Sequence, residues 1–215
     1  MPVTLVNPNT SARTTTEMVR IARAACPALQ VSGLTAPFGA DLITNAAQLD
    51  EAARAVAALL PALRDSDAVI VAAFGDPGCA ALRARLACPV IGLAEAAMAE
   101  AAAGGRRFAV VTTTPDLVGP IAGRAAAYGH AGFAGTWITP GDPVGIMADE
   151  GALIAALDAE CRRAIADGGA DAIVIGGGPL ARAAEALAGS VGVPLIAPVP
   201  AAMRRARHLL MEAQP

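Results

Sequence analysis

The segment 67–78, DAVIVAAFGDPG, recurs in altered form at 171–180, DAIVIGGGPL. Each copy begins with a short run of β-branched apolar residues, which is typical of a strand buried on both faces, and continues into a glycine turn. A helix-like stretch then leads to a second apolar run, CPVIGL at 88–93 and VPLIAP at 193–198. The second copy follows the first by about half the length of the chain. This internal repeat predicts two similar α/β halves.

Short apolar runs alternate with longer Ala/Leu/Arg stretches along the whole chain, as expected when parallel strands are joined by crossover helices. The expected strands are Val3–Val6, Leu29–Ser32, Ala68–Ala72, Val90–Leu93, Ala109–Thr112, Thr136–Ile138, Ala172–Ile175 and Leu195–Ala197. The expected helices are Ala12–Ala25, Ala46–Leu63, Gly78–Leu86, Ala94–Ala103, Leu117–Tyr128, Ala152–Asp167, Pro179–Leu187 and Pro200–Met211. The predicted fold class is therefore α/β, with residues 1–98 plus 199–215 in one lobe and 99–198 in the other.

The composition excludes several classes of function. The chain has 215 residues, of which 55% are hydrophobic and 16% charged, so it can bury a substantial core. Its formal net charge of -3 leaves no basic face for nucleic acid and no polybasic patch for a membrane surface. All 16 basic residues are arginine, which rules out a lysine Schiff base and a P-loop lysine.

The cysteines and histidines show no metal-binding spacing. The four cysteines are scattered along the chain, and the two histidines are far apart in sequence. We therefore expect reduced thiols, no metal and no other cofactor. The amino-terminal residues enter a strand directly, and no apolar stretch has transmembrane length, so we expect a soluble, cytoplasmic protein.

Polar loops follow the first strand of each half. The segment Asn7-Pro8-Asn9-Thr10-Ser11 precedes a helix and can offer amide, hydroxyl and helix N-terminal N–H groups to a carboxylate or carbonyl. Thr112-Thr113-Thr114-Pro115 is its counterpart in the second half. The alternative is that these side chains only cap their helices. Because both loops lie at the carboxyl ends of strands, we expect them to face each other across a ligand cleft.

The two glycine turns are expected to form the floor of that cleft. In Phe74-Gly75-Asp76-Pro77-Gly78, Asp76 either caps its helix or acts as a base or hydrogen-bond acceptor. The turn Gly176-Gly177-Gly178-Pro179-Leu180 permits close approach of the backbone to a ligand. It lacks the G-x-G-x-x-G spacing of dinucleotide-binding proteins, which disfavours nucleotide binding.

These motifs together carry a family resemblance. NPNTS, AFGDPG, PVIGLAEAAM, FAVVTTT, DAIVIGGGPLA and VPLIAPVPAAM occur in order over nearly the whole chain. They resemble the aspartate/glutamate/hydantoin racemase superfamily, and most closely its hydantoin and allantoin racemase branch. The resemblance implies two Rossmann-like lobes related by a pseudo-twofold axis and a cofactor-independent site between them. It also implies acid/base chemistry at a carbon next to a carbonyl group.

The resemblance further implies two catalytic cysteines, one on each side of the substrate carbon. This sequence has Ala73 and Gly177 at the two corresponding positions, and neither residue can ionise. A positioned acid or base contributes a factor of roughly 10² to 10⁴, so an ordinary two-thiol mechanism should be severely weakened. Cys79, at the start of a helix, is a possible substitute thiol, but free cysteines are commonly buried, which favours a packing role. Glu95 is a possible base, or an acid that complements a helix dipole.

Two classes of function remain open. The first is an isomerase of the racemase type, or a diverged lyase, decarboxylase or hydrolase, acting on a small carboxylate or hydantoin-like ligand. The second is a non-catalytic relative that binds such an anion. In both cases we expect a homo-oligomer and no nucleic-acid or membrane partner. The expected ligand-binding residues are Asn7, Asn9, Thr10, Ser11, Phe74, Gly75, Thr112, Thr113, Thr114, Gly178 and Pro179, and the expected catalytic residues are Asp76, Glu95 and Cys79.

Overall fold

The computed structural model describes residues 1–212 and divides into two compact units. The first unit contains Met1–Ala96 and the chain from Val199 onward, and the second contains Ala97–Pro198. Both units are α/β, in agreement with the predicted fold class.

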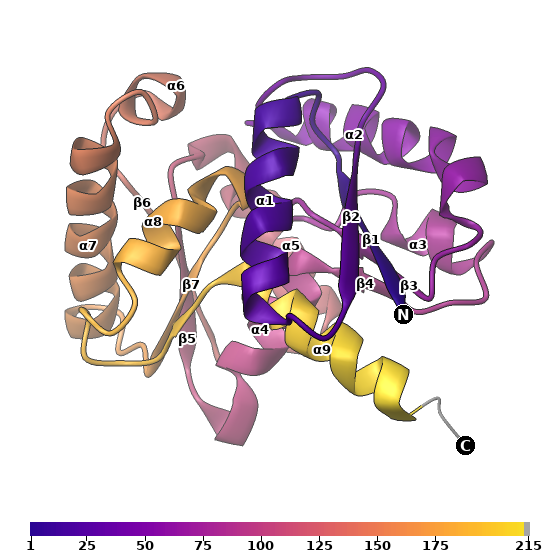
Figure 1. The fold of residues 1–215 in the computed structure, drawn as a ribbon. Helices are drawn as coiled ribbons and strands as arrows, with labels where there is room; N and C mark the ends of the chain where they lie inside the picture. Colours follow the sequence, from indigo (N-terminus) through magenta and orange to yellow (C-terminus); the bar gives the residue numbers. More distant parts are fainter. Residues whose placement is uncertain (213–215) are drawn as a thin grey trace. The chain divides into compact units, whose positions relative to one another are not determined.

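The first unit is built on a four-stranded parallel sheet (Figure 1). Its strand order is β2-β1-β3-β4, which places β1 and β3 in the centre. Helix α1 packs along β2. The strands are β1 Pro2–Asn7, β2 Gln30–Thr35, β3 Ala68–Val71 and β4 Val90–Gly92. The helices are α1 Ala12–Ala25, α2 Ala46–Ala58, α3 Cys79–Arg83, α4 Leu93–Ala101, which crosses into the second unit, and α9 Pro198–Glu212.

The second unit repeats this topology with the strand order β6-β5-β7-β8. All of its strand pairs are parallel, and α7 packs on β5, β6 and β7. The strands are β5 Phe108–Thr112, β6 Phe133–Ile138, β7 Ala172–Ile175 and β8 Leu195–Ile196. The helices are α5 Val118–Ala127, α6 Pro143–Ile146, α7 Glu150–Ala166 and α8 Ala181–Ala186.

The structure departs from the predicted elements where proline and polar residues interrupt a pattern. The helix expected over 46–63 ends at Ala58 and gives way to a 3₁₀ turn over Leu60–Leu63, because Pro61 cannot donate a helical hydrogen bond. The short helix α6 was not expected. It begins with Pro143 and is capped by the Asp142 carboxylate, which accepts from Gly145 N–H at 2.7 Å.

The central strands carry the core of each unit. Every residue of β3, β5 and β7 is buried. In the first unit Val69 and Val71 pack with Leu63 and Leu82 from the flanking segments. Strands covered on both faces read as continuous apolar runs, which explains why the sequence located them well.

Two arginines protect the open edges of the first sheet. In β2, the outward carbonyl of Val31 accepts from Arg23 Nε at 3.0 Å and from Arg23 Nη2 at 2.7 Å. In β4, the carbonyl of Val90 accepts from Arg83 Nε and Nη2 at the same two distances. An unpaired strand edge is a template for association with another chain. Each arginine occupies one acceptor of such an edge.

Within residues 1–212, no helix is both long and apolar enough to cross a membrane.

Replacing Arg23 by Met should leave the outward Val31 carbonyl unpaired. We expect the free energy of unfolding to fall by about 1 kcal/mol, because a charge-assisted hydrogen bond is lost. We also expect stronger self-association, because the edge becomes available for pairing. Urea titration and light scattering measure these effects. Arg13→Met, at an exposed position of the same helix, is the control, and identical behaviour of the two variants would contradict the edge-protecting role.

Candidate functional site

The loop after β1 is held together by its own polar side chains. Asn7 is fully buried and donates through Nδ2 to Asn9 Oδ1 at 2.7 Å and to Thr15 Oγ1 at 3.0 Å. It also donates to the Ser11 carbonyl at 3.0 Å. The Thr15 hydroxyl is bonded to that of Thr35, at the end of β2, at 2.7 Å. The Asn7 amide, expected to face a ligand, instead fixes the loop to α1 and β2.

Asn9 and Ser11 have different roles in this loop. Asn9 Oδ1 accepts from Asn7 Nδ2 and from Ser11 N–H, the latter at 3.0 Å. This orients the amide and leaves Asn9 Nδ2 without a partner among residues 1–212. The Ser11 hydroxyl accepts from Thr14 N–H at 3.2 Å and caps α1, as the capping alternative predicted. Asn9 is therefore the side chain of this loop that can present an amide donor.

The remaining loop position, Thr10, is half-buried. Its backbone N–H donates to the Ala40 carbonyl at 3.0 Å, which ties the loop to the segment after β2.

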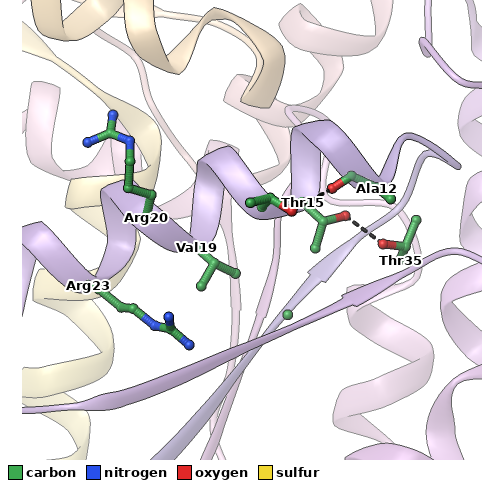
Figure 2. A pocket seen from close by; sticks show the side chains of 8 residues that line it. Ala12, Thr15, Val19, Arg20, Arg23 and Thr35 are labelled. Atoms are coloured by element: carbon green, nitrogen blue, oxygen red, sulfur yellow. Dashed lines mark hydrogen bonds between the residues drawn. The ribbon is translucent and has the colours of Figure 1, made fainter.

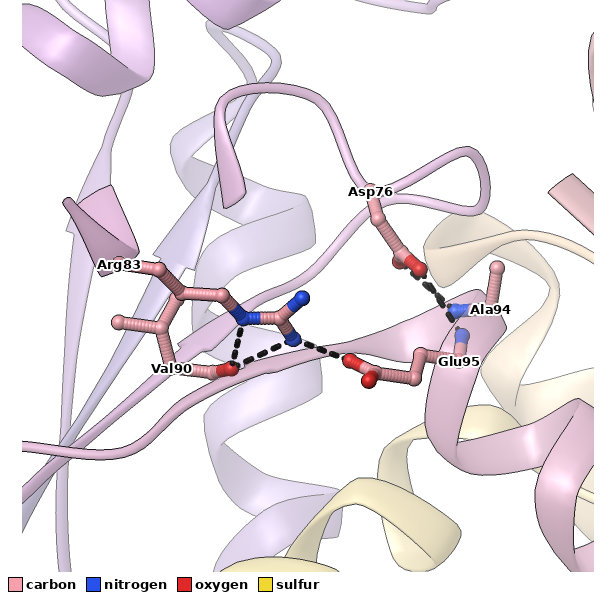
Figure 3. A network of polar contacts seen from close by, with 5 residues as sticks. All are labelled: Asp76, Arg83, Val90, Ala94 and Glu95. Carbon is pink, nitrogen blue, oxygen red and sulfur yellow. Dashed lines mark hydrogen bonds and ion pairs between the residues drawn. The ribbon is translucent and has the colours of Figure 1, made fainter. Parts of the chain in front are cut away.

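Asp76 lies in the turn before α3, but its buried carboxylate caps the later helix α4 (Figure 3). It is 2% exposed, and its two carboxylate oxygens accept from the N–H groups of Ala94 and Glu95, each at 2.8 Å. These N–H groups begin α4, so the carboxylate satisfies two helix-end donors and complements the helix dipole. The sequence left two roles open for Asp76, and the cap on the helix that directly follows it is wrong, because α3 has no side-chain cap within residues 1–212. Both carboxylate oxygens are bonded to α4, and a catalytic role of Asp76 stays a prediction.

The backbone around Asp76 is shaped to bring its carboxylate to α4. Asp76 has a φ of 52°, the only positive φ of a non-glycine residue in the described chain. The adjoining Gly75 and Gly78 have φ values of 120° and 79°, which favour glycine. A Cβ atom at Gly92 would overlap the Asp76 carboxyl group. The glycines of this turn therefore allow the backbone conformation of the cap, and Phe74, in the same turn, is 6% exposed.

Glu95 lies in the first turn of α4, where it forms an ion pair with Arg83 (Figure 3). Both side chains are about two-fifths exposed, at 39% and 40%. Arg83 also holds the carbonyl of Val90, so the pair connects α3, β4 and α4. Glu95 thus has the dipole-complementing position that the alternative interpretation predicted, and its charge is shared with a cation.

The thiols of the described chain are poorly suited to nucleophilic or acid/base work. Cys79 is the first residue of α3 but is only 4% exposed, and it packs with Val56 and Leu63. Cys161 is fully buried on α7, where burial and the nearby Asp158 raise the pKa of its thiol to about 12. The packing interpretation fits both residues.

In the second unit, threonine hydroxyls occupy the edge at which β5 ends. Thr112, Thr113 and Thr114 are 2%, 2% and 6% exposed. The Thr112 hydroxyl donates to the Gly176 carbonyl at 2.8 Å and lies 3.3 Å from the Thr114 hydroxyl. Thr112 therefore joins the ends of β5 and β7. The predicted polar edge is present. Of its three hydroxyls, that of Thr112 forms a hydrogen bond between β5 and the end of β7.

The turns after β3 and β7 are built alike. Ala72 and Gly176 each donate their N–H to the central strand beside them, at 2.8 Å in both units. The next residues, Ala73 and Gly177, are both half-buried although their predecessors are buried. The repeat therefore equates Ala73 with Gly177 in structure as well as in sequence. Both positions are partly open, so each can face a ligand.

The backbones at these two positions differ. Gly177 has a φ of 133°, which L side chains rarely adopt, whereas Ala73 does not have a positive φ. Gly178 is buried and begins a 3₁₀ turn, and Pro179 in that turn is half-buried.

An open groove of about 510 Å³ lies elsewhere on the first unit, along α1 and the edge strand β2 (Figure 2). Thr15 and Thr35 join across one end of it through their hydroxyl groups. Its two cations are already engaged, Arg20 with Glu17 and Arg23 with the Val31 carbonyl. The groove therefore offers no acid, base or nucleophile for chemistry.

Among residues 1–212, no cluster of three or more His, Cys, Asp or Glu side chains could hold a metal ion.

Comparison with known proteins identifies the family. The sequence profile described as Asp/Glu/Hydantoin racemase matches residues 3–206. The chain belongs to this family. A hydantoin racemase of Paenarthrobacter aurescens is 32% identical over 147 residues, which cover 67% of this chain and 61% of the relative. One of Rhizobium meliloti is 35% identical over 145 residues, 67% of this chain and 60% of the relative. The match thus spans about three-fifths of the length of these relatives.

Solved structures of the same branch superpose closely. An allantoin racemase from Klebsiella pneumoniae has a TM-score of 0.92 and 32% identity, covering 99% of this chain and 88% of its own. An allantoin racemase from Pseudomonas fluorescens has a TM-score of 0.93 and 31% identity, covering 99% and 92%. The resemblance to the hydantoin and allantoin racemase branch is therefore confirmed.

Sequence reasoning missed two residues that matter at these edges. Arg83 was not singled out because a lone arginine near a helix end is usually solvated, and its contact with Val90 depends on tertiary structure. Thr139, which directly follows β6, was not recognised because a single threonine before Pro140 looks like a turn residue. The available signal was its place at the carboxyl end of a strand of the second half.

Asp76→Asn tests whether this carboxylate is a cap. Asparagine tolerates a positive φ and keeps one acceptor oxygen, so we expect a loss of about 1–2 kcal/mol in the free energy of unfolding. Asp76→Ala removes both acceptors and should cost about 3 kcal/mol or more. Urea titration measures both values. A variant series with unchanged stability but abolished activity would instead assign Asp76 to catalysis.

Cys79→Ala tests the packing role of that thiol. Removing a buried sulfur should lower the free energy of unfolding by about 1 kcal/mol, since a small cavity is left. Any activity per folded molecule should stay within a factor of about two, because the thiol is buried in an apolar cluster. The comparison is made on protein shown to be folded by circular dichroism. A loss greater than a hundredfold would show that Cys79 takes part in the chemistry.

Proposed function

We propose that this chain exchanges or inverts the proton on the carbon next to a carbonyl group of a small hydantoin-type substrate, without a cofactor. The observation that carries the proposal is the chain-long similarity to allantoin racemase structures, at TM-scores of 0.92 and 0.93 with 32% and 31% identity. The matched hydantoin racemases support the same substrate class. The proposed reaction is an isomerase reaction on a hydantoin or allantoin.

The chemistry needs a base to take the proton, for which the proposal relies on solvent water or hydroxide, and hydrogen-bond donors to stabilise the anion that is left. Removing a proton next to a carbonyl develops negative charge on the carbonyl oxygen, and prearranged donors stabilise that charge. In the first unit Asn9 Nδ2 is an oriented donor without a partner in the described chain. The N–H groups of Phe74 and Gly177 take no part in the backbone hydrogen bonds of residues 1–212. We propose that the two donors of the first unit, Asn9 Nδ2 and the N–H group of Phe74, bind the enolate-like state.

We expect proton transfer to be the slow step of the proposed reaction. Ala73 and Gly177 stand where the family resemblance implies thiols, and the two nearby carboxylates are held by α4 and by Arg83. We therefore expect slow exchange with solvent rather than the rapid two-base inversion of a thiol pair.

Proton exchange on the substrate carbon in deuterated buffer tests the function. Hydantoins with one substituent at C5, allantoin and acidic amino acids are incubated with enzyme, and deuterium uptake is followed by mass spectrometry beside an enzyme-free control. Uptake above the control on a hydantoin or allantoin supports the proposal. Uptake on none of them would overturn the catalytic proposal and leave only binding.

Restoring the thiols should raise the rate. Ala73→Cys fits an ordinary backbone, so it should fold like the wild type and increase deuterium exchange about tenfold or more. Gly177→Cys needs the φ of 133° to change, which should cost about 1–3 kcal/mol of stability. The double variant should increase optical inversion by about a hundredfold, measured by polarimetry. Matched serine variants are the control, and equal rates in the cysteine and serine series would contradict the assignment of these positions.

A further inference from the structure

At the polar edge of the second unit, the buried hydroxyl of Thr139 has no hydrogen-bond partner within the described chain. Thr139 directly follows β6 and is 2% exposed, and its Oγ1 has no hydrogen-bond partner among residues 1–212. Leaving a buried hydroxyl unpaired is costly, and the great majority of buried polar side-chain groups have a partner. Such an exception calls for a physical reason.

The backbone places this hydroxyl beside the threonine edge. Thr139 N–H donates to the Thr112 carbonyl at 3.0 Å. Because Thr112 pairs with Ile138 in the register of β5 and β6, the next residues, Thr113 and Thr139, lie abreast where the strands end. No hydrogen bond of the Thr113 side chain is found within residues 1–212 either. Two hydroxyls that the fold does not use therefore stand at one end of the sheet.

The first unit shows that the fold does not require a hydroxyl at this position. There, Ala36 occupies the equivalent place after β2, and its N–H donates to the Asn7 carbonyl at 2.9 Å. Ala36 is 5% exposed and has no polar side-chain atom. The same backbone bond is thus formed with alanine in one unit and with threonine in the other, so this bond does not depend on the hydroxyl of Thr139.

We propose that Thr139 is a ligand-binding residue whose hydroxyl donates a hydrogen bond to a carbonyl or carboxylate oxygen of the bound substrate, beside Thr113. The inference rests on the proposed function, and it adds a binding residue to it. Rotation about χ1 by about 120° can move the hydroxyl of a threonine into the position that its methyl group held, so the hydroxyl can turn toward an arriving oxygen. The unpaired state in the free protein is then relieved when the ligand binds.

The chain supplies a matched control for this proposal. Among residues 1–212, Thr136 is the other residue with a buried hydroxyl that has no partner, but it lies within β6, where it pairs in register with Val110. Thr136→Val and Thr139→Val remove the same group and keep the same shape. If both hydroxyls are unpaired in the free protein, both variants should keep or raise the Tm, by roughly 2–4 °C where it rises.

The decisive measurement is binding of 5-benzylhydantoin, by calorimetry, to the wild type and to each variant. We expect Thr139→Val to weaken binding about tenfold, while Thr139→Ser and Thr136→Val stay within about twofold of the wild type. Equal affinity of Thr139→Val and the wild type, an equal loss in Thr136→Val, or no binding to the wild type would overturn the proposal. A fall of several degrees in the Tm of Thr139→Val would also overturn it, because the hydroxyl would then have a partner such as an internal water.

Deuterium exchange separates this inference from the proposed function. If Thr139→Val loses affinity while the wild type exchanges no deuterium, the edge is a binding site and the proposed reaction fails. If the wild type exchanges deuterium and Thr139→Val does so with unchanged affinity and rate, the reaction stands and the role of Thr139 fails.

Discussion

The carboxylate of Asp76 holds together the edge of the first unit at which β3 ends. It spans from the turn after β3 to the first N–H groups of α4, at 2.8 Å to each. A buried carboxylate without such donors would be strongly destabilising, so the turn, the positive φ of Asp76 and the absence of a side chain at Gly92 are needed together. The position of α4 and of Glu95 follows from this contact. Chemistry at this edge must therefore use groups that the cap leaves available.

The two units solve the same architectural problem with different side chains. In both, the central strand accepts backbone hydrogen bonds from the strands on either side at its carboxyl end. The first unit fills this end with amides, because the buried Asn7 joins Asn9 and Thr15 into one network. The second fills it with threonines, of which Thr112 alone is bonded across to β7. The amide edge is self-satisfied apart from Asn9, whereas the threonine edge keeps unused hydroxyls.

The sequence predicted the strands and the repeat because burial on both faces leaves a signal that needs no tertiary information. It also predicted that polar residues would collect at the ends of β1 and β5, since parallel strands deliver their carboxyl ends to one edge. The partners of those residues could not be predicted. Asp76 contacts α4 across 18 positions of sequence, and whether a carboxylate caps the next helix or a later one depends on packing. The same holds for Asn7, whose amide turns toward Thr15 rather than outward.

Under the proposed function, the turns at Ala73 and Gly177 could bind a ligand, but the side chains at these positions cannot transfer a proton. Both positions follow a residue whose N–H is bonded to the central strand, and both are half-buried, so under the proposed function each could approach a ligand. The side chains at these positions are a methyl group and a hydrogen atom, which allow a ligand to come close but have no ionisable proton to give or take. Gly177 has moreover a backbone conformation open mainly to glycine, so a side chain at that position requires the turn itself to change. Evolution of a thiol there therefore needs a conformational step as well as a substitution, whereas at Ala73 the substitution is enough.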